Sequence, residues 1–341
     1  MRSDLASLLP VRVAARYLLA EGVVGFDLVA VDGMPLPAYE PGAHIDVHTP
    51  GGAVRPYSLC HPHEVGQPYR IAVLLEATGR GGSASMHADV ATGAVLKIGL
   101  PRNLFALNEH APHTVLLAGG IGITPLLAMA ERLHALRQPY VLHYATRNRA
   151  SAAFADALRS GRLPAHAHLH HDDEAGGLLD IPRILRAAPP GSHLYVCGPG
   201  GFVQAVRDAA QALAWPEAQV HVEAFSAPLK PASQTAAATA SGDASSHASS
   251  SEAGAFEVAL SRTGGIVTVR PHQTIVDALA AHGLRVPVSC EQGLCGTCET
   301  RVLDGQVDHR DFHYSAAEQA RHDRMLICCS RSHGPRLVLD L

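Results

Sequence analysis

Several features that would place this chain in a special class are missing from its sequence. No run of eighteen or more apolar residues occurs, so no membrane-spanning helix is expected. The first five residues lack the apolar core of a signal peptide. The formal net charge is only −4 at pH 7, which gives no reason to expect nucleic acid or an anionic membrane as a partner.

Cysteine is also scarce, with seven residues in 341, and a disulfide framework suits small secreted domains rather than a chain of this length. We therefore expect a cytoplasmic protein whose thiols stay reduced. The composition is otherwise ordinary for a soluble globular protein, with 47% hydrophobic and 17% charged residues. The length allows two or three domains, each with its own core.

Residues 11–101 consist of short β segments separated by glycine and proline, and helical periodicity is nearly absent. This spacing predicts an antiparallel barrel or sandwich. The strands are predicted at 11–19, 23–31, 44–47, 57–59, 69–75 and 95–100.

Two polar motifs interrupt this predicted barrel. The first, Arg55-Pro56-Tyr57-Ser58, lies on a strand, where alternation sends Arg55 and Tyr57 to one side and Ser58 to the other. The second, residues 79–87 (GRGGSASMH), is a glycine-rich turn that leads into a short helix, an arrangement in which backbone N–H groups can hold a phosphate. Either motif alone is weak evidence for a binding site, but the two together on one barrel favour a flavin mononucleotide site.

From about residue 103 the pattern changes to alternating strands and helices, which predicts a parallel sheet with its ligand at the carboxyl ends of the strands. Strands are predicted at 114–118, 140–145, 167–170 and 193–197, and helices at 126–137 and from about 202 to 213.

The first strand of this region leads into Gly119-Gly120-Ile121-Gly122, with Thr124 predicted as the helix N-cap and Pro125 at the first helical position. This turn is not the G-x-G-x-x-G of dinucleotide-binding folds. Its position still favours a pyrophosphate at the helix N-terminus. The alternative is a glycine turn that only packs the strand on the helix.

Residues 230–254 are mostly Ala, Ser and Thr with almost no large apolar side chains, and they are predicted to form a flexible linker. The remaining residues, 256–341, predict a small α+β fold. They contain a hairpin around Gly264-Gly265, a helix at 274–282, a strand at 299–303, a helix near 316–322 and a last strand at 337–341.

Within this last segment Cys290, Cys295 and Cys298 have the spacing C-x4-C-x2-C, and Cys328 and Cys329 follow. Three thiols on one loop and a distant fourth are the ligand pattern of a plant-type [2Fe-2S] cluster. Gly293 and Gly296 would let the backbone bend tightly around such a cluster.

Three alternatives remain open on the sequence alone, which favours the cluster over each of them. A structural zinc site usually needs paired C-x2-C motifs or Cys/His pairs, and here only Cys295 and Cys298 form such a motif. A thioredoxin-like pair would need to open a helix, whereas residues 299–303 alternate like a strand. A disulfide framework is the third.

With these motifs the chain resembles the phthalate dioxygenase reductase family, the reductase components of Rieske oxygenases. The resemblance extends over nearly the whole length and the domain order. It implies an antiparallel β-barrel flavin domain at 1–103, an α/β parallel-sheet nucleotide domain of the ferredoxin-reductase type at 104–229 and, after the linker, an α+β plant-type ferredoxin (β-grasp) domain at 255–341.

The resemblance also implies roles for individual residues, and it makes FMN the expected flavin rather than FAD. The residues implied to hold the flavin are Arg55, Tyr57, Ser58, Gly81, Gly82 and Ser83. Those implied to bind the nucleotide are Gly120, Gly122, Thr124, Pro125, Gly198 and Pro199. Those implied to lie at the site of hydride transfer are Ser58, Cys197 and Phe225. The family text M-x-x-C-x-S-R selects Cys328 over Cys329 as the fourth ligand, beside Cys290, Cys295 and Cys298.

The predicted function is electron transfer from NADH through FMN and the cluster to a Rieske-type oxygenase, by a protein expected to be a monomer. A flavin links a two-electron donor to a one-electron acceptor, which explains the three modules. Alternatives are a stand-alone NADH oxidase or ferric reductase, and a redox-sensing iron–sulfur protein. Arg147 and Arg149 argue for NADPH. A metal site at His168, His170, His171, Asp172 and Asp173 is a weaker reading than a loop beside the nucleotide.

Overall fold

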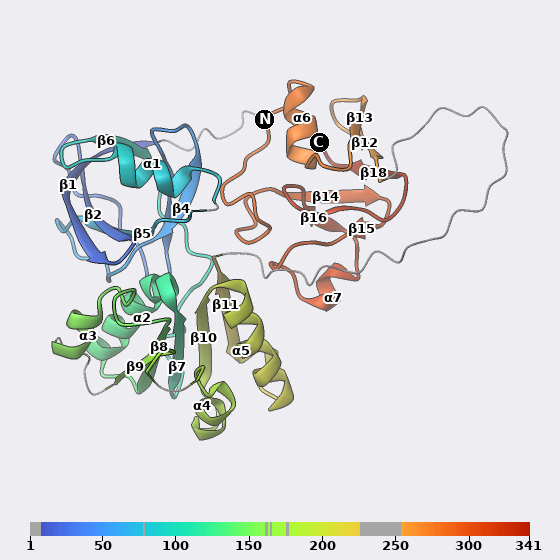
Figure 1. Cartoon of the computed structure of the whole chain (residues 1–341). Coiled ribbons are helices and arrows are strands. Elements are labelled where there is room, and N and C mark those ends of the chain that lie inside the picture. Colours follow the sequence, from blue (N-terminus) through green and yellow to red (C-terminus); the bar gives the residue numbers. More distant parts are fainter. Residues whose placement is uncertain (1–7, 78, 161–162, 164–165, 175–176, 226–253) are drawn as a thin grey trace. The chain divides into compact units, whose positions relative to one another are not determined.

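The computed structural model describes residues 8–77, 79–160, 163, 166–174, 177–225 and 254–341. The chain divides into two compact units, Met1–Ser226 and Ala227–Leu341 (Figure 1). The predicted linker, residues 230–254, lies outside the described residues except for Gly254.

The first unit begins with a six-stranded antiparallel sheet in the order β4-β3-β6-β1-β2-β5. Side chains that alternate inward along these strands form its core, among them the fully buried Phe26, Ile45 and Ile71. The helix α1 (Gly82–Asp89) follows β5. The strands are β1 (Leu9–Ala20), β2 (Val23–Ala30), β3 (His44–His48), β4 (Val54–Ser58), β5 (Tyr69–Leu74) and β6 (Val95–Ile98).

All six predicted strands of this region are present, and the largest difference is in β4. This strand begins at Val54 rather than residue 57, because Arg55, Pro56 and Tyr57 already pair with β3. The whole R-P-Y-S motif therefore lies on one strand.

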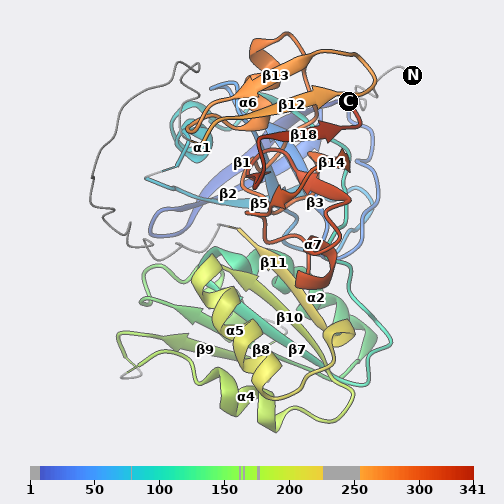
Figure 2. The ribbon, with the colours of Figure 1, turned by 90° about the vertical axis from the view of Figure 1, so that its right-hand side faces the viewer.

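The second half of this unit is a parallel sheet in the order β11-β10-β7-β8-β9, and Figure 2 shows α4 and α5 over one of its faces. The adjacent strands β7 and β10 are separated by two other strands in the sequence, so the strand order reverses between them. The elements are β7 (Thr114–Gly119), α2 (Ile123–Leu136), β8 (Tyr140–Thr146), α3 (Ala155–Ser160), β9 (Ala167–His171), α4 (Ile181–Ala187), β10 (His193–Gly198), α5 (Gly200–Ala212) and β11 (Val220–Ala224).

The four predicted parallel strands are confirmed, whereas α3, α4 and β11 were not predicted. The two helices have only six and seven residues, too few for a clear helical period. The strand β11 mixes valine with His221 and Glu223, and an interrupted apolar pattern of five residues gives little signal.

The barrel and the parallel sheet share one continuous core. Val23, Cys60 and Ala72 of the barrel pack in the same cluster as Leu127 of α2. Gly42 joins the two halves closely, because a Cβ atom at this position would overlap the carbonyl oxygen of Phe105. Its φ of +95° is also a backbone conformation that favours glycine.

The second unit contains a five-stranded mixed sheet in the order β13-β12-β18-β14-β16, in which β12 and β18 are parallel, and a separate β15-β17 pair. The helix α6 starts with a capping box between Thr274 and Asp277. The elements are β12 (Phe256–Leu260), β13 (Ile266–Val269), α6 (Ile275–Ala281), β14 (Glu299–Asp304), β15 (Val307–Asp308), α7 (Ala316–Gln319), β16 (Arg324–Leu326), β17 (Arg331–Ser332) and β18 (Arg336–Leu339).

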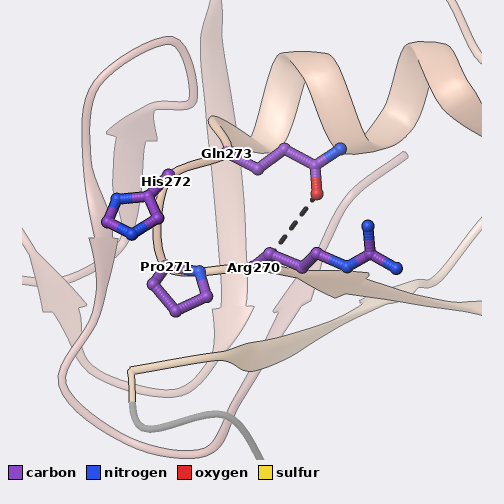
Figure 3. A pocket seen from close by; sticks show the side chains of 4 residues that line it. All are labelled: Arg270, Pro271, His272 and Gln273. Atoms are coloured by element: carbon purple, nitrogen blue, oxygen red, sulfur yellow. Dashed lines mark hydrogen bonds between the residues drawn. The ribbon is translucent and has the colours of Figure 1, made fainter.

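A surface pocket in this unit is lined by the turn from β13 to α6, residues Arg270 to Gln273 (Figure 3). The amide of Gln273 donates to the carbonyl of Arg270 at 3.1 Å, and the Gln273 side chain accepts from the Arg270 amide at 3.5 Å. The Arg331 side chain also donates to the carbonyls of Arg270 and Gln273, and none of the predicted site residues lines this pocket.

We expect Gly42→Ala to destabilise the first unit by about 3 kcal/mol, because it adds a steric overlap with Phe105 to the strain of a positive φ. Gly33→Ala is the matched control, since Gly33 also has a positive φ of +74° but a Cβ atom there would meet no other atom within 4 Å. It should cost only about 1 kcal/mol. Urea unfolding measures both, and equal losses would contradict a close approach at Gly42.

Candidate functional site

Two segments of the second unit bring the predicted cluster ligands together. Cys290, Cys295 and Cys298 lie on the loop between α6 and β14, and Cys328 lies in the turn that follows β16. Antiparallel pairing of β14 with β16 places the end of the loop beside this turn. Cys298 and Cys328 are both buried in the core of the unit.

The four thiols form two pairs. Cys290 donates to Cys295, and this hydrogen bond lowers the pKa of Cys295 to about 5. Cys298 donates to Cys328, and this bond is the largest cause of a Cys328 pKa of about 3. Each of these hydrogen bonds raises the pKa of the donor thiol and lowers the pKa of the acceptor thiol.

The backbone of the loop is bent so that its N–H groups face the sulfur atoms. Gly293 and Gly296 have φ values of +74° and +71°, as their predicted role requires. The amide of Gln292 donates to Cys290 Sγ at 3.4 Å, and the amide of Gly293 donates to the Cys328 thiol. Such donors stabilise negative charge on ligand sulfurs.

This donor set fits a [2Fe-2S] cluster, in which each of two irons takes two cysteine sulfurs. Within the described ranges, no group of three or more His, Cys, Asp or Glu residues could hold a single metal ion. A tetrahedral zinc would need all four ligands around one point, and two separate pairs do not provide this. The strand β14 begins at Glu299, so Cys298 does not open a helix as a thioredoxin-like motif would.

The Cys329 thiol donates a hydrogen bond to the Cys328 thiol. The Cys329 thiol also lies 3.6 Å from the carbonyl oxygen of Leu326 and 3.7 Å from the hydroxyl of Ser330. Gly293 passes so close to this thiol that a Cβ atom on Gly293 would overlap it. Cys329 therefore packs against Gly293 and Cys328, whereas Cys328 also pairs with Cys298.

In the first unit the two polar motifs of the barrel meet. The side chain of Arg55, from β4, lies directly against the backbone of Gly82, where a Cβ atom would be only 2.7 Å from the Arg55 side chain. Gly81 precedes α1 with a φ of +81°, and no side chain caps this helix. A guanidinium and an uncapped helix N-terminus are thus adjacent, and both attract phosphate.

Tyr57 and Ser58 extend this arrangement along β4. Ser58 is buried, and burial raises the pKa of the Tyr57 phenol to about 12, so it stays protonated. Ser83, the first residue after the glycines, accepts a hydrogen bond from the Glu76 amide at 3.0 Å and can still donate its own hydroxyl proton.

The glycine turn after β7 lies beside the end of β10. A Cβ atom on Gly122 would overlap the carbonyl of Cys197, and Gly198 packs against Gly119 with similar closeness. The two predicted nucleotide motifs are therefore adjacent at the point where the strand order reverses, which is where ligands of such sheets bind.

The predicted helix start was wrong. The helix α2 begins at Ile123 with Gly122 as its N-cap, and Thr124 lies inside its first turn. The Thr124 hydroxyl donates to the carbonyl of Ile121 at 3.0 Å instead of accepting from a helix amide. A short 3₁₀ turn at Gly120–Gly122 makes this possible, because it starts the helical backbone earlier than a Thr cap would.

Glu223 was missed by the sequence analysis, although it stands two residues before Phe225. Its carboxyl group lies 4.0 Å from the Cys197 thiol, and burial raises its pKa to about 8. The pKa of Cys197 is raised well above its usual value by burial and by Glu223. Phe225 is placed beside them, since its amide donates to the carbonyl of Gly198 at 3.2 Å. A lone Glu on a five-residue strand gives no signal in the sequence.

The weaker metal reading at residues 168–173 is not supported. His170 bonds to His143 on β8, whereas His171 lies on the other face of β9 and bonds to Thr146. Alternation along the strand thus separates the neighbouring histidines. After the strand, Glu174 forms an exposed ion pair with Arg149.

Comparison with known proteins yields two family models and close full-length relatives. Residues 258–333 match the 2Fe-2S iron-sulfur cluster binding domain, and residues 97–220 match the N-terminal domain of the dimethylamine monooxygenase subunit DmmA-like family. A vanillate O-demethylase oxidoreductase of Pseudomonas putida is 43% identical over 96% of this chain and 98% of that protein.

Two solved structures cover nearly the whole chain. Phthalate dioxygenase reductase, described as a modular structure for electron transfer from pyridine nucleotides to [2Fe-2S], is 34% identical, with a TM-score of 0.74 and 98% of both chains covered. An intact type IV self-sufficient cytochrome P450 monooxygenase is 34% identical, with a TM-score of 0.77; all of this chain matches 43% of that protein. None of the helices among the described residues is long and apolar enough to cross a membrane.

We expect Cys328→Ser to lose the cluster and Cys329→Ser to keep it, because only Cys328 pairs with Cys298. Iron and acid-labile sulfide, counted per chain after purification without oxygen, measure this directly. A Cys329→Ser protein without iron, beside a fully loaded Cys328→Ser protein, would reverse the assignment.

Glu223→Gln should change how stability depends on pH. The folded chain holds the Glu223 proton up to a pKa of about 8, whereas an exposed Glu releases it near 4.5. The free energy of unfolding should therefore fall as the pH rises from about 5 through 8, and Glu223→Gln should remove this loss. Urea unfolding at pH 6 and pH 8.5 tests it, with the exposed Glu217→Gln as control; parallel changes in both variants would contradict a buried proton.

Proposed function

The chain belongs to the phthalate dioxygenase reductase family, and on this basis we propose that it transfers electrons from NADH through FMN to a [2Fe-2S] cluster and on to a Rieske-type oxygenase. The chain is an oxidoreductase with flavin, nucleotide and [2Fe-2S] modules. The flavin type, the nucleotide preference, the oxygenase partner and the residue roles are parts of the proposal.

The observation that carries the proposal is the set of sites that each of the two units contains. In the first unit, the predicted nucleotide turn at Gly122 lies against Cys197. The same unit contains Arg55 beside Gly82, the proposed binding site of the flavin phosphate. The second holds four thiols in two pairs. A flavin accepts two electrons from a hydride donor and releases them singly, and a [2Fe-2S] cluster accepts one, so these sites suit consecutive steps.

In this proposal, different residues of the first unit bind the flavin phosphate, the flavin ring and the nucleotide. Arg55 and the amides of Gly82 and Ser83 hold the flavin phosphate, while Tyr57 and Ser58 line the flavin ring. At the nucleotide turn, Gly120, Gly122, Thr124 and Pro125 bring backbone amides to the pyrophosphate, and Gly198 and Pro199 keep the nearby strand end close.

The nicotinamide end lies between Cys197 and Phe225 in this proposal. The raised pKa keeps the Cys197 thiol neutral, so it packs against the ring rather than attacking it. With a pKa of about 8, Glu223 is protonated at neutral pH and can donate a hydrogen bond without placing a negative charge at the site.

The choice of FMN rests on the compact phosphate cradle at the N-terminus of α1 and on the family motif G-R-G-G-S. NADH is favoured because Arg149, one of two arginines after β8 that argue for NADPH, is already engaged by Glu174. The protein is proposed to act as a monomer.

A Rieske-type oxygenase fits the direction of electron flow. Plant-type clusters have potentials near about −400 mV, whereas Rieske centres start near about −150 mV, so transfer between them is downhill. In the second unit, Cys290, Cys295, Cys298 and Cys328 would hold the cluster that makes this last transfer.

Cys295→Ser should abolish NADH-dependent electron delivery to a Rieske oxygenase while ferricyanide reduction by the flavin stays near the wild-type rate. The reason is that Cys295 belongs to the second unit only, so the flavin and nucleotide sites are unchanged. Stopped-flow and steady-state assays with NADH measure both activities.

Equal loss of the two activities would contradict the modular route. Fast oxygen or ferric iron reduction by the wild-type chain without any partner would instead support the alternative of a stand-alone oxidase or ferric reductase. Negligible turnover of NADH would favour a redox sensor.

A further inference from the structure

A buried carboxylate lies behind the cysteine loop. The side chain of Asp311 is 0% exposed and accepts three hydrogen bonds: from His309 Nδ1 at 3.0 Å, from the Tyr314 amide at 3.1 Å and from the Ser330 hydroxyl at 3.3 Å. An ionised carboxylate only accepts hydrogen bonds, so all three of these donors suit it. None of the roles assigned above uses this residue.

One side of Asp311 contacts the cysteine loop. A Cβ atom on Gly293 would lie 3.0 Å from the Cα atom of Asp311, and the amide of the next residue, Phe312, donates to the Gly293 carbonyl at 3.1 Å. The Gly293 amide in turn donates to the Cys328 thiol. Asp311 thus packs against Gly293, whose amide connects the cysteine loop to the fourth ligand, Cys328.

The other side contacts the segment that carries the fourth ligand. Ser330 stands two residues after Cys328; its hydroxyl donates to Asp311 and accepts from the Arg310 amide at 3.3 Å. Cys329, between them, packs its thiol against Ser330 and Gly293. The Asp311 carboxylate therefore bonds to the segment that carries Cys328, while the Asp311 backbone lies against the cysteine loop.

The negative charge of Asp311 is only weakly offset. In the part of the chain that the structure describes, its ion-pair partner is His309, whose side chain is 5% exposed and whose Nε2 atom has no hydrogen-bond partner. The adjacent Arg310 pairs instead with Asp308 at the surface. A buried charge that water does not screen acts over a longer distance than an exposed one.

We propose that Asp311 is a positioning residue of the [2Fe-2S] site, which holds the cysteine loop against the Cys328 segment and whose buried charge keeps the reduction potential of the cluster low. This inference rests on the proposed assignment of the four cysteines to that cluster. Reduction adds one electron, so a fixed negative charge nearby disfavours the reduced form. Hydrogen bonds and net charge around the sulfurs are known determinants of such potentials.

The test is the midpoint potential of the cluster in the full-length protein, measured by dithionite titration with mediators and followed by electron paramagnetic resonance. Asp311→Asn keeps the shape and removes the charge, so the potential should become more positive. Asp308→Asn is the matched control, because it removes a carboxylate three residues away that is 23% exposed and paired with Arg310. It should leave the potential unchanged.

Ser330→Ala provides the opposite change. It keeps the carboxylate but removes one of its three donors, so the charge is less offset and the potential should become more negative. Opposite shifts in Asp311→Asn and Ser330→Ala are not expected from a residue that only stabilises the fold.

An unchanged potential in cluster-loaded Asp311→Asn, or shifts of both variants in the same direction, would overturn the proposal. If Asp311→Asn does not retain the cluster, Ser330→Ala decides, and an unchanged potential there overturns it. Because dithionite replaces NADH in this titration, the result is independent of whether NADH is the physiological donor.

Discussion

Four thiols from two distant parts of the sequence must reach one small volume, and much of the second unit is arranged to satisfy this requirement. The loop with Cys290, Cys295 and Cys298 cannot bend far enough without positive φ values at Gly293 and Gly296. The fourth thiol arrives through the pairing of β14 with β16, which fixes the turn at Cys328 beside Cys298. The sheet therefore acts as the scaffold of the metal site, and the loop supplies the geometry that strands cannot.

Close contacts at glycine residues play the same part in the first unit. Gly122 lies against the Cys197 carbonyl, Gly82 lies against the Arg55 side chain and Gly42 lies against Phe105. At each of these positions any side chain would separate two segments that have to be in contact. The first two contacts lie at the proposed nucleotide and phosphate sites, and the third joins the barrel to the parallel sheet.

Burial without full compensation recurs beside both proposed redox sites. Glu223 is held next to Cys197 with a pKa of about 8, and Asp311 is held behind the cysteine loop with hydrogen bonds but no arginine or lysine partner among the described residues. Leaving a carboxyl group in a poorly solvated place costs stability. In the family to which the chain belongs, electron transfer gives a reason for that cost, since local charge and proton affinity decide how easily an acceptor is reduced.

The sequence by itself determined most of the elements and the candidate cysteine ligands. The C-x4-C-x2-C spacing, the R-P-Y-S strand and the alternation of strands and helices are local patterns. Each involves residues that are close together in the sequence, so each can be recognised without the structure. The six barrel strands, the four parallel strands and the hairpin at Gly264-Gly265 were predicted for this reason. The linker prediction falls outside the described residues, and the roles of the individual site residues remain proposals.

Only the tertiary structure decided which distant residues meet. It paired Cys298 with Cys328, brought Arg55 to Gly82, moved the N-cap of α2 from Thr124 to Gly122 and revealed a half-buried acid, Glu223, and a buried one, Asp311. An isolated Asp or Glu has no periodicity and no motif, so its burial depends entirely on what the fold packs around it. The sequence therefore specifies the chemistry of the ligands, whereas the fold sets the environment in which that chemistry occurs.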